Sequence, residues 1–225
     1  KNNLLFGKDA HFEFVKSYAQ SNEIKTFDES IDNLSNEKII VQGQEIVSRI
    51  AEYNRDIDIN VSLEAEKNQI SIHNSSGLNL SEKKSLYSCV IEGTLSCDDE
   101  ILNIYKSEAS GSSDLKIMNI AQEFIFLFEY SKKKARLDRE ASHLPVIFHP
   151  DAIDVLFLSL LHAFNGHNVY HQISPLAGKE GTKEFSKSFT VRENPKINYA
   201  TFSRNFDDEG MQSREKYFIH DGVVN

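Results

Sequence analysis

The chain has 225 residues and a formal net charge of −9, with 40% hydrophobic and 26% charged residues. This length is enough for one large or two small domains with a sizeable core, and the composition is ordinary for a globular protein. The acidic balance argues against nucleic-acid binding as the main function. No apolar run is long enough to span a bilayer, so we expect neither a direct nucleic-acid partner nor a membrane partner.

The two cysteines, Cys89 and Cys97, lie outside any CxxC motif and have no nearby histidine in the sequence. We therefore expect buried structural thiols, with no disulfide framework and no nucleophile. Together with the absence of a visible signal peptide, this cysteine usage favours a cytoplasmic protein.

The N-terminal half predicts an α+β domain over residues 35–142, and residues 1–34 are expected to be the tail of a preceding region. Ser35 is typical of a helix N-cap, with Glu37 in the first turn. The helical spacing of apolar residues predicts an inward face made of Ile39, Ile46, Ile50 and Tyr53.

The pattern of apolar residues then changes to a period of two, which predicts an antiparallel meander with one face on a core. The expected strands cover residues 57–63, 69–74, 84–94 and 100–107, with turns at 66–68, 75–77 and 96–99. A long helix over residues 114–139 should follow, buried along a stripe made of Ile117, Ile120, Ala121, Phe124 and Phe128. The basic run at residues 132–136 and Arg139 are interpreted as the solvated end of this helix.

Residues 143–225 predict the first part of a second, mixed and β-rich domain. A strand is expected at 144–148, and then a helix that begins at Pro150 and stops at Asn165 and Gly166. A further strand is expected at 185–191, and a hairpin over 216–225 turns at Asp221 and Gly222. The return strand has only three residues, which favours a fragment of a longer protein. The predicted fold class is therefore α+β: an antiparallel sheet flanked by helices, followed by the start of the second domain.

Three histidines, His162, His167 and His171, are the only grouping typical of a metal site. Zinc sites on helices usually place two histidines four residues apart with an adjacent glutamate. Here His162 and His167 are five residues apart, Gly166 lies between them, and Ala163 follows His162. The residues favour surface histidines without a metal, and leave His162 and His167 as an alternative pair of metal ligands.

Three consecutive carboxylates, Asp207, Asp208 and Glu209, precede Gly210. They could clamp a metal or act as an acid–base set. The other interpretation is a structural loop in which one carboxylate caps a turn and the others are solvated or paired with Arg204 or Arg214. We expect a structural loop near an active cleft, in which Asp208→Ala would disturb folding or assembly more than chemistry.

The order of several segments resembles the TldD/PmbA family, the so-called modulators of DNA gyrase. The matching segments are residues 72–77, 85–91, 145–152, 165–170, 176–181 and 206–210. The resemblance extends from about residue 37 to the end of the chain and depends on the ordered set rather than on one motif. Family members are longer than this chain, so the resemblance also implies an internal fragment.

The family has two branches, and the resemblance to one of them implies a role. TldD-like members are zinc peptidases with a His-Glu-x-x-x-His motif and a later cysteine ligand, whereas PmbA-like (TldE) members lack the motif. Both histidine positions are filled here, by His162 and His167, but Ala163 occupies the position of the glutamate that would activate a zinc-bound water. The short spacing from His167 to Gly181 and the pair Val169 and Tyr170 also fit the PmbA-like branch.

The resemblance therefore implies a non-catalytic subunit that pairs with a TldD-like catalytic subunit, or with itself, and helps to process small unfolded peptides. No catalytic, cofactor-binding or metal-binding residue is expected in this chain, and zinc is expected in the partner. Peptide is expected to bind by strand addition to an exposed sheet edge. Two alternatives stay open: an autonomous TldD-like zinc peptidase that uses His162 and His167, and a regulatory protein that binds DNA gyrase.

Overall fold

The computed structural model describes residues 13–18, 24–97, 100–133 and 144–225, with the backbone alone described at Cys97. The chain divides into two compact units. Unit 1 contains residues 1–133 and 195–214, and unit 2 contains residues 134–194 and 215–225. The domain boundaries expected from the sequence stay predictions.

The first long helix of unit 1 is α1 (Asn36–Tyr53), which follows the short 3-10 helix η2 (Glu29–Asn33). Ser35 is its N-cap, because the Ser35 hydroxyl accepts a hydrogen bond from the Lys38 amide at 3.3 Å. Ile46 and Ile50 are completely buried. The predicted cap and inward face are both confirmed.

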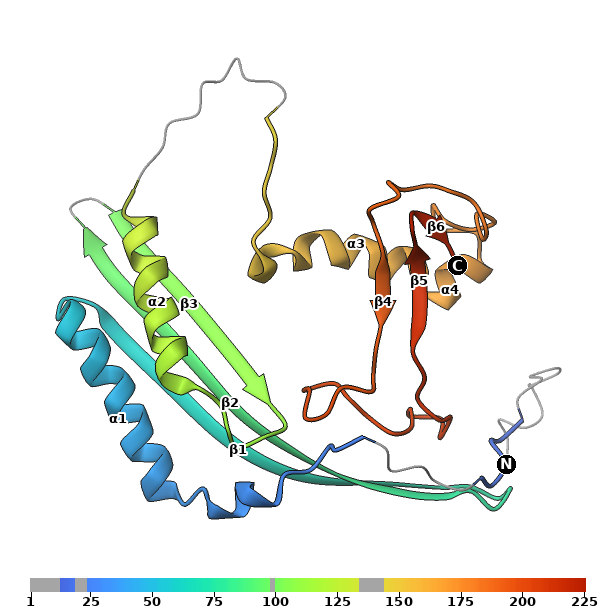
Figure 1. Ribbon diagram of the computed structural model, residues 1–225, viewed down its shortest axis with the longest axis horizontal. Coiled ribbons are helices and arrows are strands. Elements are labelled where there is room, and N and C mark those ends of the chain that lie inside the picture. The colour runs from blue at the N-terminus through green and yellow to red at the C-terminus, as the bar shows by residue number, and fades with distance from the viewer. Residues whose placement is uncertain (1–12, 19–23, 98–99, 134–143) are drawn as a thin grey trace, which may run out of the picture. The chain divides into compact units, whose positions relative to one another are not determined.

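The sheet of unit 1 is an antiparallel meander in the order β1-β2-β3, shown in Figure 1. Its strands are β1 (Asp58–His73), β2 (Asn79–Cys97) and β3 (Glu100–Ser110). The meander and the turn at 75–77 are confirmed, and Gly77 adopts a φ of 87° in that turn. The predicted turn at 66–68 is wrong, because β1 pairs with β2 without interruption from Asp58↔Thr94 to His73↔Asn79.

The buried face of this sheet changes along its length. In the half of β2 that pairs with β3, the odd-numbered residues Tyr87, Cys89 and Ile91 are completely buried. Near the β1–β2 turn, the even-numbered Leu80 and Glu82 are buried instead. Neighbouring residues of a strand point to opposite faces, so the two halves of the hairpin bury opposite sides of one sheet.

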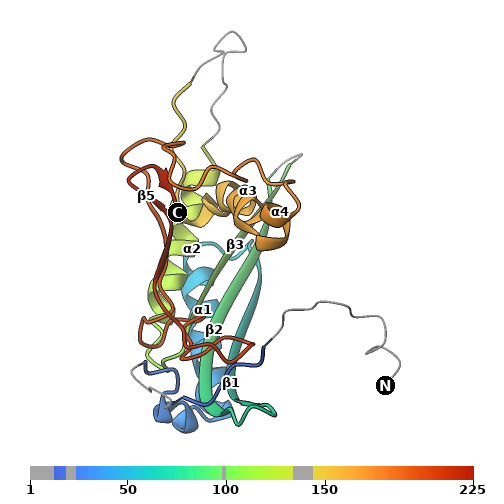
Figure 2. The same ribbon diagram turned by 90° about the vertical axis from the view of Figure 1, so that its right-hand side faces the viewer.

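The helix α2 (Ile117–Ser131) packs with α1 on one face of the sheet, as Figures 1 and 2 show. All five residues of the predicted stripe are buried: Ile117, Ile120, Ala121, Phe124 and Phe128. The helix begins three residues later than predicted and ends at Ser131, since Lys132 is its C-cap. Residues 134–139 of the predicted helix, and most of the basic run, lie outside the described residues.

An extended segment, residues 24–28, lies along β2 beyond the end of β3. The Ser85 amide donates to the Thr26 carbonyl at 3.1 Å, and the Thr26 hydroxyl donates to the Lys83 carbonyl at 2.9 Å. On its other side the Tyr199 amide donates to the Lys25 carbonyl at 2.7 Å. This segment therefore joins β2 to the loop 195–214, which returns to unit 1 from far along the chain.

The described helices of unit 2 are short. η3 (Pro150–Ala152) starts at the predicted proline and is followed by α3 (Asp154–Phe164) and α4 (Gly166–Tyr170). The predicted helix end at Asn165 is confirmed, but residues 144–148 form no strand among the described residues and are exposed. Within the described residues, no helix is both long and apolar enough to cross a membrane.

The sheet of unit 2 contains β4 (Val191–Glu193), β5 (Lys216–His220) and β6 (Val223–Val224). The predicted hairpin is confirmed, with φ of 50° at Asp221 and 81° at Gly222. The predicted strand at 185–191 is wrong except at Val191, where β4 begins. β4 and β5 pair at Glu193↔Lys216, so the loop 195–214 leaves unit 2 between two paired strands and contributes to unit 1. The predicted fold class, an antiparallel sheet flanked by helices in an α+β chain, is confirmed.

Candidate functional site

His162 and His167 lie on two separate helices of unit 2. His162 is in the last turn of α3, and His167 is in the first turn of α4. Asn165 separates them: its side-chain oxygen accepts hydrogen bonds from the amides of His167 at 3.0 Å and Asn168 at 3.3 Å. The Asn168 side chain in turn donates to the His162 carbonyl at 2.9 Å. Capping by Asn165 thus ends one helix and starts the next between the two histidines.

Ala163, which follows His162, is the one buried residue of α3, with 6% of its surface exposed. Its carbonyl accepts a hydrogen bond of 2.6 Å from the hydroxyl of Ser174, which is also buried. A glutamate at this position would place a carboxylate in the interior of unit 2, where an unpaired charge is costly. The local packing around residue 163 therefore suits a small apolar side chain.

Among the described residues, the donor set around the histidines is smaller than that of a catalytic zinc ion. Such an ion takes three protein ligands and leaves one position open. His162, His167 and His171 are exposed, and the rings of His167 and His171 lie 4.4 Å apart between centroids. Across residues 13–18, 24–97, 100–133 and 144–225, no three histidine, cysteine, aspartate or glutamate side chains come together as a metal site. The alternative in which His162 and His167 bind a metal stays a prediction.

The carboxylates of residues 207–209 lie in a tight turn of unit 1. The Asp207 amide donates to the Met211 carbonyl at 2.9 Å, and the Asp207 side chain accepts from the amides of Glu209 at 3.0 Å and Met211 at 2.8 Å. Asp208 is fully exposed, and its carboxylate lies 3.4 Å from the Arg204 guanidinium. The structure thus places the turn-capping role on Asp207, so Asp208→Ala is no longer expected to disturb folding.

A small apolar cluster anchors this turn to the sheet. Phe206 is buried with Leu78 and Leu80 of the β1–β2 hairpin, and Tyr18 packs against them. The Tyr18 hydroxyl donates to the Gly210 carbonyl at 2.9 Å. Burial, and secondarily the nearby Asp207 carboxylate, raise the pKa of Tyr18 above its usual value. These contacts fix residues 206–210 against the β1–β2 hairpin of unit 1.

A buried polar clamp lies beside this cluster and was missed by the sequence-based prediction. The amide and the side-chain nitrogen of Asn205 both donate to the Glu82 carboxylate, and Asn205 also bonds both backbone groups of Ile24. Glu82 and Asn205 are 6% and 7% exposed. The predicted strand began at residue 84 and left Glu82 out. Continuing the alternation from Leu78 and Leu80 to Glu82 would have placed this carboxylate on a buried face.

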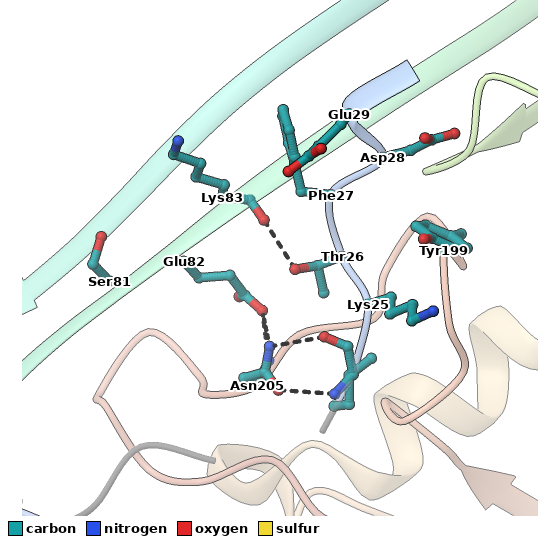
Figure 3. A pocket seen from close by; sticks show the side chains of 11 residues that line it. Lys25, Thr26, Phe27, Asp28, Glu29, Ser81, Glu82, Lys83, Tyr199 and Asn205 are labelled. Atoms are coloured by element: carbon teal, nitrogen blue, oxygen red, sulfur yellow. Dashed lines mark hydrogen bonds between the residues drawn. The ribbon is translucent and has the colours of Figure 1, made fainter. Parts of the chain in front are cut away.

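Figure 3 shows the pocket that this clamp borders, between the extended segment 24–28 and β2. Its volume is about 530 Å³. Several polar groups that line it bond each other: Glu82 binds Asn205, and the Thr26 hydroxyl binds the Lys83 carbonyl. Because these groups already have hydrogen-bond partners, the pocket is best explained as the boundary where the loop 195–214 packs against the sheet.

Comparison with known proteins gives a consistent set of similarities. Residues 141–225 match the family model described as PmbA/TldA metallopeptidase C-terminal domain. An uncharacterised protein of Methanocaldococcus jannaschii is 23% identical over 227 residues, which cover 99% of this chain and 51% of that protein. A protein named metalloprotease PmbA homolog from Buchnera aphidicola subsp. Acyrthosiphon pisum is 31% identical over 80 residues, 36% of this chain and 18% of that protein.

Solved structures show the same fold. TldE from Thermococcus kodakarensis superposes with a TM-score of 0.86 at 20% identity, over 99% of this chain and 50% of that one. A protein of Thermotoga maritima, described as a candidate modulator of a DNA gyrase, superposes with a TM-score of 0.83 at 18% identity, over 100% and 51%. The chain spans about half the length of these two structures and of the Methanocaldococcus protein.

Proposed function

Since this chain belongs to the TldD/PmbA family, we propose that it acts as a PmbA/TldE-like, non-catalytic subunit of a TldD/TldE-type metallopeptidase complex. In this proposal a TldD-like partner holds the zinc ion and cleaves small unfolded peptides. The present chain completes the complex and holds the peptide by adding it as a strand to an exposed sheet edge.

The observation that carries the proposal is the buried Ala163 beside His162. A zinc peptidase needs a carboxylate that activates the zinc-bound water, and the equivalent position here is a small apolar residue in the interior. The helix break at Asn165 also supports a non-catalytic role, because it places His162 and His167 on different helices. The two filled histidine positions favour one alternative, an autonomous zinc peptidase, which the same experiment tests.

The test is hydrolysis of an unstructured, fluorescence-quenched peptide by the purified protein, with and without a TldD-like protein. We expect no hydrolysis and no bound zinc for the protein alone, and chelator-sensitive hydrolysis in the mixture that exceeds that of the TldD-like protein alone. Size-exclusion chromatography should recover both chains in one complex. Chelator-sensitive hydrolysis by the purified protein alone would overturn the proposal.

Two variants sharpen this test. The double substitution His162→Ala with His167→Ala removes both imidazoles from exposed positions, so the activity of the mixture should stay the same. Loss of that activity, with the complex intact by chromatography, would show that these histidines bind metal or substrate. His171→Ala is the matched control, because it changes a third exposed histidine of the same region.

A further inference from the structure

The outer edge of β1 carries backbone groups that point away from the rest of its sheet. β1 is the first strand of the order β1-β2-β3, and among the described residues no strand pairs with its other side. The bonds between Thr26 and the backbone of Lys83 and Ser85 show that odd-numbered residues of β2 direct their amides and carbonyls away from β1. Residues of β1 opposite them, such as Val61↔Ile91, then direct theirs outward. The outward groups belong to Ile59, Val61, Leu63 and Ala65.

An apolar groove accompanies this edge. It has a volume of about 660 Å³ and lies between α1 and β1. Ile40 and Val47 of α1 line it and are 58% and 40% exposed, and Val61 and Leu63 of β1 line its other side. Gly43 lies between them and leaves the groove open in the middle of the helix. A strand added to β1 would place every second side chain on this face of the sheet, toward the groove.

The opposite face of the same edge is acidic. The even-numbered residues Asp58, Glu64 and Glu66 point to the side of β1 away from α1, because Val61 and Leu63 point toward it. Cross-strand pairs of opposite charge stabilise a sheet, and like charges opposite each other destabilise it. A strand added here should therefore carry basic side chains on this face.

We propose that residues 59–65 of β1 bind an extended peptide that has apolar side chains on one face and basic side chains on the other. This inference rests on the proposed function, which identifies the peptide as the substrate that this subunit holds. It adds the edge at which the peptide binds and the side-chain pattern that the edge selects. A second copy fits less well, because two β1 strands paired antiparallel about Ser62 would set Asp58 opposite Glu66.

The first experiment measures binding of labelled peptides to the full chain by fluorescence anisotropy at low salt. An octapeptide of alternating valine and lysine is expected to bind at least about tenfold more tightly than one of alternating valine and glutamate. A valine–lysine peptide with alternate backbone amides methylated should lose binding, because strand addition depends on these donors. Equal binding of the methylated peptide would overturn the proposal.

The second experiment changes the edge and the groove separately. Gly43→Leu fills the groove, and leucine has the higher helix propensity, so weaker binding cannot be attributed to a weakened helix. Ala65→Pro removes one outward amide and leaves the bonds to β2 intact. Each should weaken binding at least about tenfold. Gly43→Ala is the matched control, since its added methyl carbon would lie at an ordinary 3.8 Å from Leu63, and should leave binding unchanged.

The outcomes separate this inference from the proposed function. Unchanged binding in both Gly43→Leu and Ala65→Pro would overturn the site on β1, whatever the mixture with a TldD-like protein does. A dimer by light scattering that dissociates in both variants would assign the edge to a second copy and would also overturn it. Tight, groove-dependent binding without any partner-dependent hydrolysis would support the peptide site and reject the proposed function.

Discussion

Replacing Gly210 with alanine should destabilise unit 1, although the substitution adds only one methyl group. Gly210 has a φ of 84°, and a left-handed backbone costs a non-glycine residue about 1–2 kcal/mol. An added Cβ would also lie closer than 3.0 Å to the Leu78 side chain, inside the buried cluster of Leu78, Leu80 and Phe206. Overpacking of this kind costs about 1–3 kcal/mol, so we expect a total loss of about 2–5 kcal/mol.

A double-mutant cycle with Leu78→Ala separates the two contributions. Leu78 is 2% exposed, and its truncation alone should cost about 2–5 kcal/mol. In that background the steric overlap is absent and only the backbone cost remains, so Gly210→Ala should cost about 1–2 kcal/mol. Gly77→Ala is the control, because Gly77 also has a positive φ, 87°, but nothing lies within 4 Å of its added Cβ.

The measurement is urea-induced unfolding followed by circular dichroism, with hydrogen exchange of residues 78–86 assigning the transition to unit 1. This prediction is contradicted if Gly210→Ala and Gly77→Ala cost the same, or if the cost of Gly210→Ala does not change when Leu78 is truncated. Either result would mean that the loop 206–210 is not packed against the hairpin as the contacts indicate.

Three further predictions concern charged and titratable groups. Asp207→Ala should cost about 1–2 kcal/mol in urea unfolding, because two amides lose their acceptor, whereas the exposed Asp208→Ala should change stability by less than about 0.5 kcal/mol. Hydrogen bonds from the Ser30 hydroxyl and the Ser113 amide hold the pKa of Asp28 well below its usual range. The carboxylate of Asp28 therefore adds to the free energy of unfolding above about pH 4, and this contribution is lost as the pH falls toward the lowered pKa of the folded state. Asp28→Asn should flatten the acid side of the stability profile, and an unchanged profile would contradict this. Burial, with a smaller effect of Glu108, raises the pKa of the Cys89 thiol to about 11. The contribution of this thiol to the free energy of unfolding is therefore present below its unfolded pKa of about 8.5 and is lost as the pH rises toward 11. In a Cys97→Ser background, iodoacetamide should alkylate Cys89 at pH 8 only after unfolding, and rapid alkylation of the folded protein would refute its burial.

The features that the sequence predicted correctly are local ones. The cap at Ser35, the stripe of α2 and the turn at Asp221 and Gly222 depend on residues within one or two turns of the chain. The clamp between Glu82 and Asn205 joins residues 123 positions apart, and no short-range pattern contains it. The capping role of Asp207 rather than Asp208 also depends on which of two neighbouring side chains turns inward, which composition alone does not decide.

The error at residues 66–68 has a specific physical cause. Apolar residues occupy odd positions from Ile57 to Leu63 and even positions at Ile70 and Ile72. This change of phase resembles a break between two strands, because a single strand with one buried face would keep its phase. In the structure β1 is continuous, and the phase changes because the helices cover one face at one end and the loop 195–214 covers the other face at the other end.

Residues 206–210 are prominent in the family resemblance, and their packing suggests what they contribute to the stability of unit 1. The loop 195–214 leaves unit 2 between paired strands, where Glu193 and Lys216 form an ion pair at 3.0 Å, and its residues complete the second core of unit 1. A substitution that loosens the loop therefore affects a segment whose two ends are fixed in unit 2. If the proposed function depends on a folded unit 1, Gly210→Ala should lower activity in the mixture in proportion to the loss of stability. Asp208→Ala should leave activity and stability unchanged together, and a loss of activity in Asp208→Ala at full stability would instead give this carboxylate a chemical role.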